Sequence, residues 1–185
     1  MKKGKVIYTG KSGHGNEFII RYPQKKDAKL MWEYINTISK ERTFISFQGE
    51  EISIEDETEF LNSQLEKISK NKAVLLLVFS NDEVIGISGI NMSQRIEKHI
   101  GIFGISLAKD FRAQGIGTKL MELVFEEAEN NLHGLEIVTL GVFDNNPIAK
   151  EMYERFGFLE YGNLPKGIIL ENGYQDHIFM YKTIK

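Results

Sequence analysis

Residues 111–121 read FRAQGIGTKLM and join two different patterns. An apolar run ends at Leu107, and the apolar periodicity of a helix begins at Ile116, with Gly115 and Gly117 at its start. A strand, a glycine turn and a helix in this order leave backbone N–H groups free at a helix N-terminus, where they and the helix dipole favour a phosphorylated ligand. A Gly-x-Gly sequence alone is more often only a tight turn, so the function depends on the rest of the chain.

The composition of the 185 residues narrows the class of protein. Hydrophobic residues make up 42% and charged residues 26%, which is typical of one globular domain. A formal net charge of -3 offers no basic surface for nucleic acid. The absence of cysteine excludes disulfides, a cysteine nucleophile and cysteine ligands for zinc, and we expect no metal site. With neither a signal peptide nor an apolar run near the roughly 20 residues that cross a bilayer, we expect a cytoplasmic protein without membrane binding.

The predicted elements describe one domain that follows a short arm. Residues 1–16 are rich in Lys, Gly and Ser and lack a sustained period, so we expect a flexible N-terminal arm, in which residues 6–8 fit a short edge strand. The domain is expected over residues 17–185. Its predicted strands cover residues 17–22, 73–79, 84–92, 99–107, 135–142, 158–161 and 177–181, and its helices lie at residues 25–40, after Ser53, after the glycine turn and from Pro147 to Gly157.

This order predicts an α/β (α+β) fold with a mixed, mostly antiparallel central sheet and helices on both faces. The strands before the glycine turn form hairpins, whereas the strand–helix–strand unit around the turn implies one parallel pair with a right-handed crossover. A doubly wound nucleotide fold is not expected, because Gly115-x-Gly117 lacks a third glycine and follows hairpins.

Acidic residues cluster at the start of the second helix, and two interpretations stay open. The cluster comprises Glu50, Glu51, Glu55, Asp56, Glu57 and Glu59. Carboxylates complement the positive end of a helix dipole, which makes a solvated helix start the simpler interpretation. The alternative is an acidic rim that attracts a cationic substrate.

Two motifs resemble those of one enzyme family. Arg112-Ala113-Gln114-Gly115-Ile116-Gly117 matches Gln/Arg-x-x-Gly-x-Gly/Ala, the acetyl-CoA signature of the GNAT-superfamily N-acetyltransferases. Asn146, Ala149 and Tyr153, followed by Gly157-Phe158, match a second motif of that family at its spacing. Residues 17–185 are therefore similar to a GNAT N-acetyltransferase in motifs and in order of elements. The resemblance implies the GNAT fold, in which the two parallel strands splay apart.

The same resemblance implies how acetyl-CoA is bound. Its diphosphate would be held by the backbone amides of Arg112, Ala113, Gln114, Gly115, Ile116, Gly117 and Thr118. Its pantetheine arm would lie between the splayed strands and bond the backbone of Ile105 and Leu107, with room left by Gly104. Asn146 and Lys150 are further cofactor-binding candidates, although Asn146 also fits a simple N-cap and an exposed lysine commonly has no specific role.

The catalytic candidates are Tyr153 and His99. The resemblance makes Tyr153 the general acid that protonates the departing thiolate, whereas helical spacing alone also fits a core aromatic. Many family members carry a Glu as general base on the strand before the signature, but the corresponding position here is Gly101. His99, two residues earlier, could act as the base directly or through water, and a structural histidine at a strand end is the alternative.

The missing Glu also bears on the acceptor. An α-amino group with a pKa of roughly 7.7–8.0 is about a quarter neutral near pH 7.4, whereas a lysine-type amine near 10.4 is only about 0.1% neutral. Lack of the usual base therefore favours an α-amine or a base that acts through water. Without a cysteine for an acyl-enzyme, we expect direct transfer to a primary amine: a small amine, an amino acid, a polyamine, an aminoglycoside-like antibiotic or a protein N-terminus.

Two other functions fit the same glycine turn. A non-catalytic acyl-CoA-binding sensor or interaction module would keep the fold without turnover, and a nucleotide-binding protein would use the turn for ATP. Retention of Asn146 and Tyr153 favours the enzyme. A homodimer is compatible with the sequence.

Overall fold

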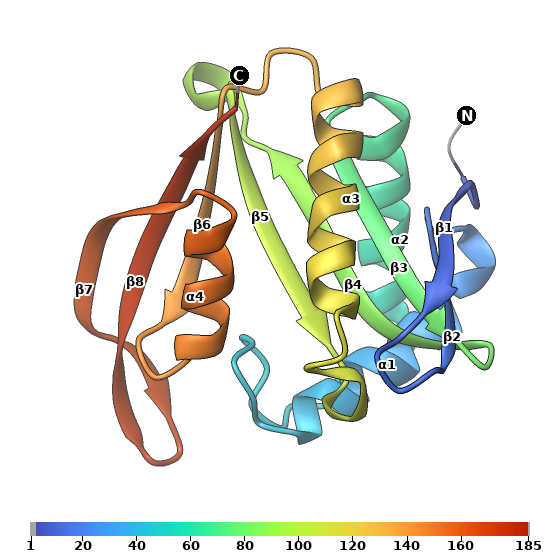
Figure 1. Ribbon diagram of the computed structural model, residues 1–185, viewed down its shortest axis with the longest axis horizontal. Coiled ribbons are helices and arrows are strands. Elements are labelled where there is room, and N and C mark those ends of the chain that lie inside the picture. Colours follow the sequence, from blue (N-terminus) through green and yellow to red (C-terminus); the bar gives the residue numbers. More distant parts are fainter. Residues whose placement is uncertain (1–2, 185) are drawn as a thin grey trace. The chain divides into compact units, whose positions relative to one another are not determined.

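The computed structural model describes residues 3–184, which form eight β-strands, four α-helices and three short 3-10 turns (Figure 1). Hydrogen bonds link the strands in the order β1-β2-β3-β4-β5-β6-β8-β7, and β5 pairs with β6 in parallel. The mixed, mostly antiparallel sheet predicted from the sequence is therefore confirmed. No helix within residues 3–184 is long and apolar enough to cross a membrane.

Two compact units make up the chain. The first contains the described residues up to Asn91 together with Gly104–His133. The second contains Met92–Phe103 and the described residues from Gly134 onward. Strand β5 (Ile100–Leu107) contributes its first half to the second unit and its second half to the first.

The first unit is organised around β3 (Ala73–Ser80), in which every residue is buried. β3 pairs antiparallel with β2 (Glu17–Arg21) and with β4 (Glu83–Met92). Both α2 (Ile54–Ser69) and α3 (Ile116–Asn131) pack on β3. Burial by two helices explains why the strand is a continuous apolar run rather than an alternating one.

The helices of the first unit begin close to where the sequence predicts them. Residues 25–40 form a 3-10 turn followed by α1 (Ala28–Lys40). α2 starts directly after Ser53, whose hydroxyl accepts a hydrogen bond from the Asp56 N–H at 3.1 Å. That bond satisfies one of the N–H groups that a helix leaves free at its start.

The N-terminal segment contains an edge strand. β1 (Val6–Lys11) pairs antiparallel with β2, and the Tyr8 ring packs on Phe18 with centroids 5.7 Å apart. The predicted arm of residues 1–16 thus includes a strand longer than residues 6–8. Its first two residues lie outside the described part of the chain.

The second unit combines the start of β5 with β6 (Ile137–Phe143), α4 (Pro147–Arg155), β7 (Leu159–Leu170) and β8 (Gly173–Thr183). Ile100–Ile102 pair in parallel with Ile137–Thr139, and the register extends over no later residues of the described chain. This short pairing is what strands that splay apart require. β8 then pairs antiparallel with β6 over seven positions, from Ile137↔Thr183 to Phe143↔His177.

The closing hairpin is longer than the sequence predicts. Strands were expected at residues 158–161 and 177–181, whereas β7 has 12 residues and β8 has 11. Gly162, Pro165 and Gly167 interrupt the apolar alternation on which the prediction depends. The structure accommodates them in two irregularities of the register, between Glu160 and Gly162 and between Leu164 and Ile168, so the strand continues beyond them.

Candidate functional site

The glycine turn of the first unit has an unusual backbone. A short 3-10 turn, Lys109–Phe111, leads into residues 112–115, and α3 begins at Ile116. Ala113 and Gly115 both have positive φ, 58° and 81°. Gly115 adopts this conformation without penalty, whereas at Ala113 it costs about 1–2 kcal/mol. Left-handed residues within such a turn point successive N–H groups into one concavity, which is a general way of binding an anion.

The N–H groups in this turn divide into engaged and available ones. The Phe111 and Arg112 amides donate within the turn, to Ala108 O at 2.9 Å and to Lys109 O at 3.2 Å. The first N–H of α3 with a partner in the helix is that of Lys119, which donates to Gly115 O at 3.1 Å. Among residues 3–184, the N–H groups of residues 113–118 have no acceptor. The available row therefore starts one residue after Arg112.

The fold requires a glycine at only one of the two glycine positions of the turn. A Cβ on Gly115 or on Gly117 would meet no protein atom within 4 Å, so open space surrounds both. Gly115 is nevertheless required by its positive φ. Gly117 has neither a positive φ nor a close neighbour, and it stands in the first turn of a helix, where glycine is unfavourable. A ligand that approaches the backbone closely would explain it.

Gln114 fixes the turn from inside. The residue is 7% exposed, and its Nε2 donates to Asp110 O at 2.6 Å. Its backbone carbonyl accepts the Gly13 N–H at 3.0 Å, which ties the β1–β2 turn to the glycine turn. Gln114 Oε1 is one of three buried side-chain polar atoms without a partner within the described chain.

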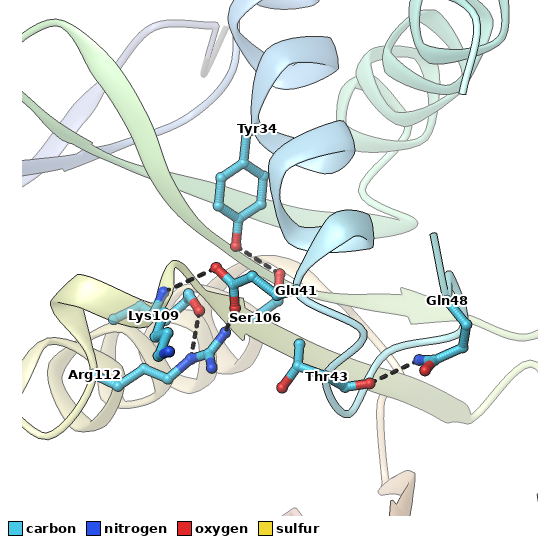
Figure 2. A network of polar contacts seen from close by, with 8 residues as sticks. Tyr34, Glu41, Thr43, Gln48, Ser106, Lys109 and Arg112 are labelled. Carbon is cyan, nitrogen blue, oxygen red and sulfur yellow. Dashed lines mark hydrogen bonds and ion pairs between the residues drawn. The ribbon is translucent and has the colours of Figure 1, made fainter. Parts of the chain in front are cut away.

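The Arg112 side chain is partly exposed, and it makes its polar contacts with the protein itself. Its Nε donates to Leu107 O at 2.8 Å, and its guanidinium pairs with the Glu41 carboxylate (Figure 2). Arg112 thus contributes to the turn through its side chain, while its own N–H is engaged.

Gly104, in the second half of β5, has open space on the side where a side chain would stand. A Cβ on Gly104 would meet no atom within 4 Å, and the Gly104 carbonyl accepts the Ser88 hydroxyl at 2.9 Å. Leu107 is buried, and Ile105 is half-buried, as expected for core side chains. The backbone role of Ile105 and Leu107 toward pantetheine stays a prediction.

In the second unit, Asn146 is the N-cap of α4. Its Oδ1 accepts the Ala149 N–H at 3.3 Å, and Pro147 follows at the first helical position, where its missing N–H has no consequence. Lys150 on the same helix donates to Glu160 at 2.8 Å, and this ion pair raises the pKa of its ammonium group. Both side chains therefore have structural partners, and their roles toward the cofactor stay predictions.

Tyr153 is buried as a ring and accessible at its hydroxyl. The residue is 7% exposed, and burial raises its pKa to about 12. The hydroxyl forms no hydrogen bond within residues 3–184. Its oxygen is not fully buried, so it reaches solvent. A phenol in this setting keeps its proton at neutral pH and can donate it to a ligand.

His99 precedes the first residue of β5. Its carbonyl accepts the Glu136 and Ile137 N–H groups at 2.8 and 3.2 Å, and its side chain is half-buried. In chain order it stands at the opposite end of β5 from Leu107. Its role as general base stays a prediction.

The structure also identifies a histidine that is not predicted from the sequence as a site residue. The His177 ring lies over Gly141, where a Cβ would be 2.1 Å from its Nε2, and it packs on Phe179 with centroids 4.3 Å apart. Burial lowers the pKa of this imidazole. The signal available in the sequence is Gly141, a glycine within an otherwise apolar strand.

The acidic cluster at the start of α2 is not uniform. Glu57 is only 7% exposed, and burial raises its pKa to about 7, so it belongs neither to a solvated helix start nor to an acidic rim. Glu55, Asp56 and Glu59 are exposed. For these three carboxylates, the acidic rim that attracts a cationic substrate stays a prediction.

The model of the acetyltransferase (GNAT) family matches residues 32–158, more than half of the chain. The chain therefore belongs to the acetyltransferase (GNAT) family and is an acyltransferase by class.

Individual relatives agree with this assignment. The chain is 30% identical over 121 residues to the L-amino acid N-acetyltransferase AaaT of Escherichia coli (strain K12). The aligned residues cover 64% of this chain and 74% of that protein. It is 32% identical to a GNAT-family acetyltransferase of Streptococcus pneumoniae, with a TM-score of 0.83 over 91% of this chain and 100% of the other. The structure of yncA from Salmonella typhimurium, solved with acetyl-CoA, has a TM-score of 0.77 at 15% identity, over 91% and 94% of the two chains, and shows likeness of fold alone.

Proposed function

We propose that the protein transfers the acetyl group of acetyl-CoA directly to a primary amine. The observation that carries this proposal is the row of amides at residues 113–118, which has no acceptor among residues 3–184 and open space around its two glycines. Such a row at the N-terminus of a 16-residue helix favours a diphosphate through hydrogen bonds and the helix dipole together. Gly117, which the fold itself does not require, supports a ligand at this position.

Tyr153 is the proposed acid of the reaction. The amine nitrogen attacks the thioester carbonyl, a C–N bond forms, and the C–S bond breaks with its electron pair going to sulfur. The phenol proton passes to that sulfur, and the amine loses one proton to a base, for which His99 is the candidate, or to water. An acyl-enzyme on cysteine is excluded because the chain contains none.

The proposed acceptor is an α-amino group, on an amino acid or at a protein N-terminus. An α-amine needs little help to become neutral, which fits the presence of Gly101 where many relatives have a Glu. The relative from Escherichia coli is named as an L-amino acid N-acetyltransferase, which supports the same class.

A thiol-release assay with acetyl-CoA tests the reaction and its acceptor together. The panel contains L-amino acids, short peptides with free N-termini, polyamines and aminoglycosides. We expect release with free amino acids or peptides, and none with Nα-acetyl-lysine, whose only amine is on the side chain. Release with Nα-acetyl-lysine but not with α-amines would overturn the acceptor class while leaving acetyl transfer intact.

Two outcomes would favour the other functions. Tight binding of acetyl-CoA without thiol release for any amine would support a non-catalytic acyl-CoA-binding module. Tighter binding of ATP than of acetyl-CoA in a calorimetric titration would support a nucleotide-binding protein. The cytoplasmic location and the homodimer stay predictions.

A further inference from the structure

Glu41 occupies a position that its own helix does not favour. It is the C-cap of α1, at the negative end of the helix dipole, where an acidic side chain is unfavourable by about 0.3–1 kcal/mol. Its side chain is only 16% exposed, so the carboxylate is also largely removed from water. A charge in such a place needs compensating partners.

Those partners belong to the turn that leads into the available amides. One carboxylate oxygen of Glu41 accepts the Lys109 N–H at 3.1 Å, and the other pairs with the Arg112 guanidinium (Figure 2). Arg112 in turn donates to Leu107 O at 2.8 Å. We call these four residues the Glu41 network. It holds the backbone at residues 107 and 109 and the side chain of residue 112, all directly before the amides of residues 113–118.

The element that carries Glu41 is itself fixed. Two turns earlier on α1, the Tyr34 hydroxyl is 2.8 Å from the Ser106 hydroxyl on β5. The segment after α1 folds back onto the helix, since Ser39 Oγ accepts the Gly49 N–H at 3.1 Å and donates to Glu50 O at 2.7 Å. A carboxylate on such an anchored helix end can define the position of the turn that it contacts.

The network also determines what Arg112 can do. Its Nε donates to Leu107 O, and Nη2, one of its two terminal nitrogens, pairs with Glu41. A guanidinium that is paired with a carboxylate adds less attraction for a diphosphate than a free one. Recognition of the anion is then left to the backbone amides and the helix dipole, whose effect depends on their exact placement.

We propose that Glu41 is a positioning residue for the acetyl-CoA diphosphate: through Arg112 and the Lys109 amide it sets the turn from which the amides of residues 113–118 bind that group. This proposal rests on the proposed function. Glu41 does not touch the ligand, and the Arg112 side chain serves the turn rather than the phosphates.

The first test is Glu41→Gln, which keeps the shape and an oxygen for the Lys109 N–H but places an amide where Arg112 needs a charge. We expect the Kd for CoA, measured by calorimetry, to rise about tenfold, which corresponds to about 1.4 kcal/mol. With the amine that the acceptor panel identifies, the KM for acetyl-CoA should rise similarly while kcat stays within about twofold. Glu66→Gln, which removes an exposed carboxylate paired with Lys70 on α2, is the matched control and should leave CoA binding unchanged.

Arg112→Lys separates positioning from direct phosphate binding. Lysine keeps the positive charge, and it is a good phosphate ligand, but its ammonium group lacks the planar fork with which Arg112 bonds Leu107 O and Glu41 from different nitrogens. Positioning therefore predicts a loss of CoA affinity in Arg112→Lys, with the same direction as in Glu41→Gln. Because this variant keeps the ion pair, it also tests the proposal should Glu41→Gln fail to fold.

Two results would overturn the proposal. One is unchanged or tighter CoA binding by folded Glu41→Gln, as expected if the released Arg112 reaches the phosphates. The other is wild-type affinity in Arg112→Lys. Failure of the proposed function gives a different result, since the wild-type protein itself would then release no thiol with any amine or would bind no CoA.

Discussion

The Tyr153 ring packs edge-on against Phe103, with ring centroids 6.1 Å apart and an angle of 86° between the planes. Phe158 lies against the same ring at 6.0 Å. Aromatic contacts therefore hold the ring, and the hydroxyl takes no part in fixing it. Packing and chemistry at this residue can be separated by removing one oxygen atom.

We expect Tyr153→Phe to lower kcat by roughly 10²–10⁴-fold, the usual contribution of a general acid, while the Kd for CoA stays within about twofold. The reason is that phenylalanine keeps the ring contacts but has no proton to give to the thiolate. Steady-state thiol release and calorimetry measure the two quantities. Tyr161→Phe is the matched control: its ring is exposed and packs on Phe179 and Tyr181, so its kcat should not change. Equal turnover in Tyr153→Phe and wild type would refute the acid role.

The raised pKa of Tyr153 also predicts a dependence of stability on pH. Burial raises this pKa from 10.0 to about 12, so between pH 10 and 12 the unfolded chain releases a proton that the folded chain keeps. Stability is thus fully present below pH 10 and falls as the pH rises through this window. At pH 11 the loss due to Tyr153 is about 1 kcal/mol. Urea unfolding should therefore show a gain for Tyr153→Phe, relative to wild type, that is larger at pH 11 than at pH 9, and a constant difference would contradict it.

Local signals were sufficient for much of the fold and for the start of the site. Ser53 and Asn146 act as N-caps, as short polar residues before an apolar periodic run predict, and the glycine turn precedes α3. These features depend on neighbours within a few residues. Glu41 is different, because its partners Lys109 and Arg112 are 68 and 71 residues away in the chain. No local pattern connects them, and the only hint is an acid at a helix C-terminus.

The same contrast explains the other differences. Glu57 stands among exposed acidic residues in the sequence, and its burial depends on how the helix packs. The continuation of β7 past Pro165 depends on its pairing with β8, which a single-strand pattern does not contain. Local sequence patterns thus do not predict the residues whose role depends on a partner far away in the chain.

Gly117→Ala should separate ligand binding from stability. Alanine in the first turns of α3 meets no protein atom within 4 Å and is the better helix former, so the free energy of unfolding should rise by about 0.5–1 kcal/mol. CoA affinity should nevertheless fall, because the added methyl group stands where the diphosphate approaches the amides. Urea unfolding and calorimetry together check the two opposite changes.

Gly115→Ala provides the contrast to that variant. Its φ of 81° disfavours a side chain, so this substitution should lower stability as well as CoA affinity. Gly117→Ala with higher stability and full CoA affinity would show that no ligand approaches this backbone.

The buried Glu57 carboxyl should cause a second dependence of stability on pH, between about pH 4.5 and 7. Burial raises its pKa from 4.5 to about 7, so between these values the unfolded chain has lost a proton that the folded chain keeps. Stability from this group is fully present below pH 4.5 and is lost as the pH rises toward 7, by about 2–3 kcal/mol between pH 5 and pH 8. Glu57→Gln removes the charge with little change of shape and should be more stable than wild type at pH 8, with a smaller gain at pH 5. Glu59→Gln, exposed on the same helix, should show no such difference, and identical pH profiles for both variants would mean that the Glu57 carboxyl is not desolvated in the folded protein.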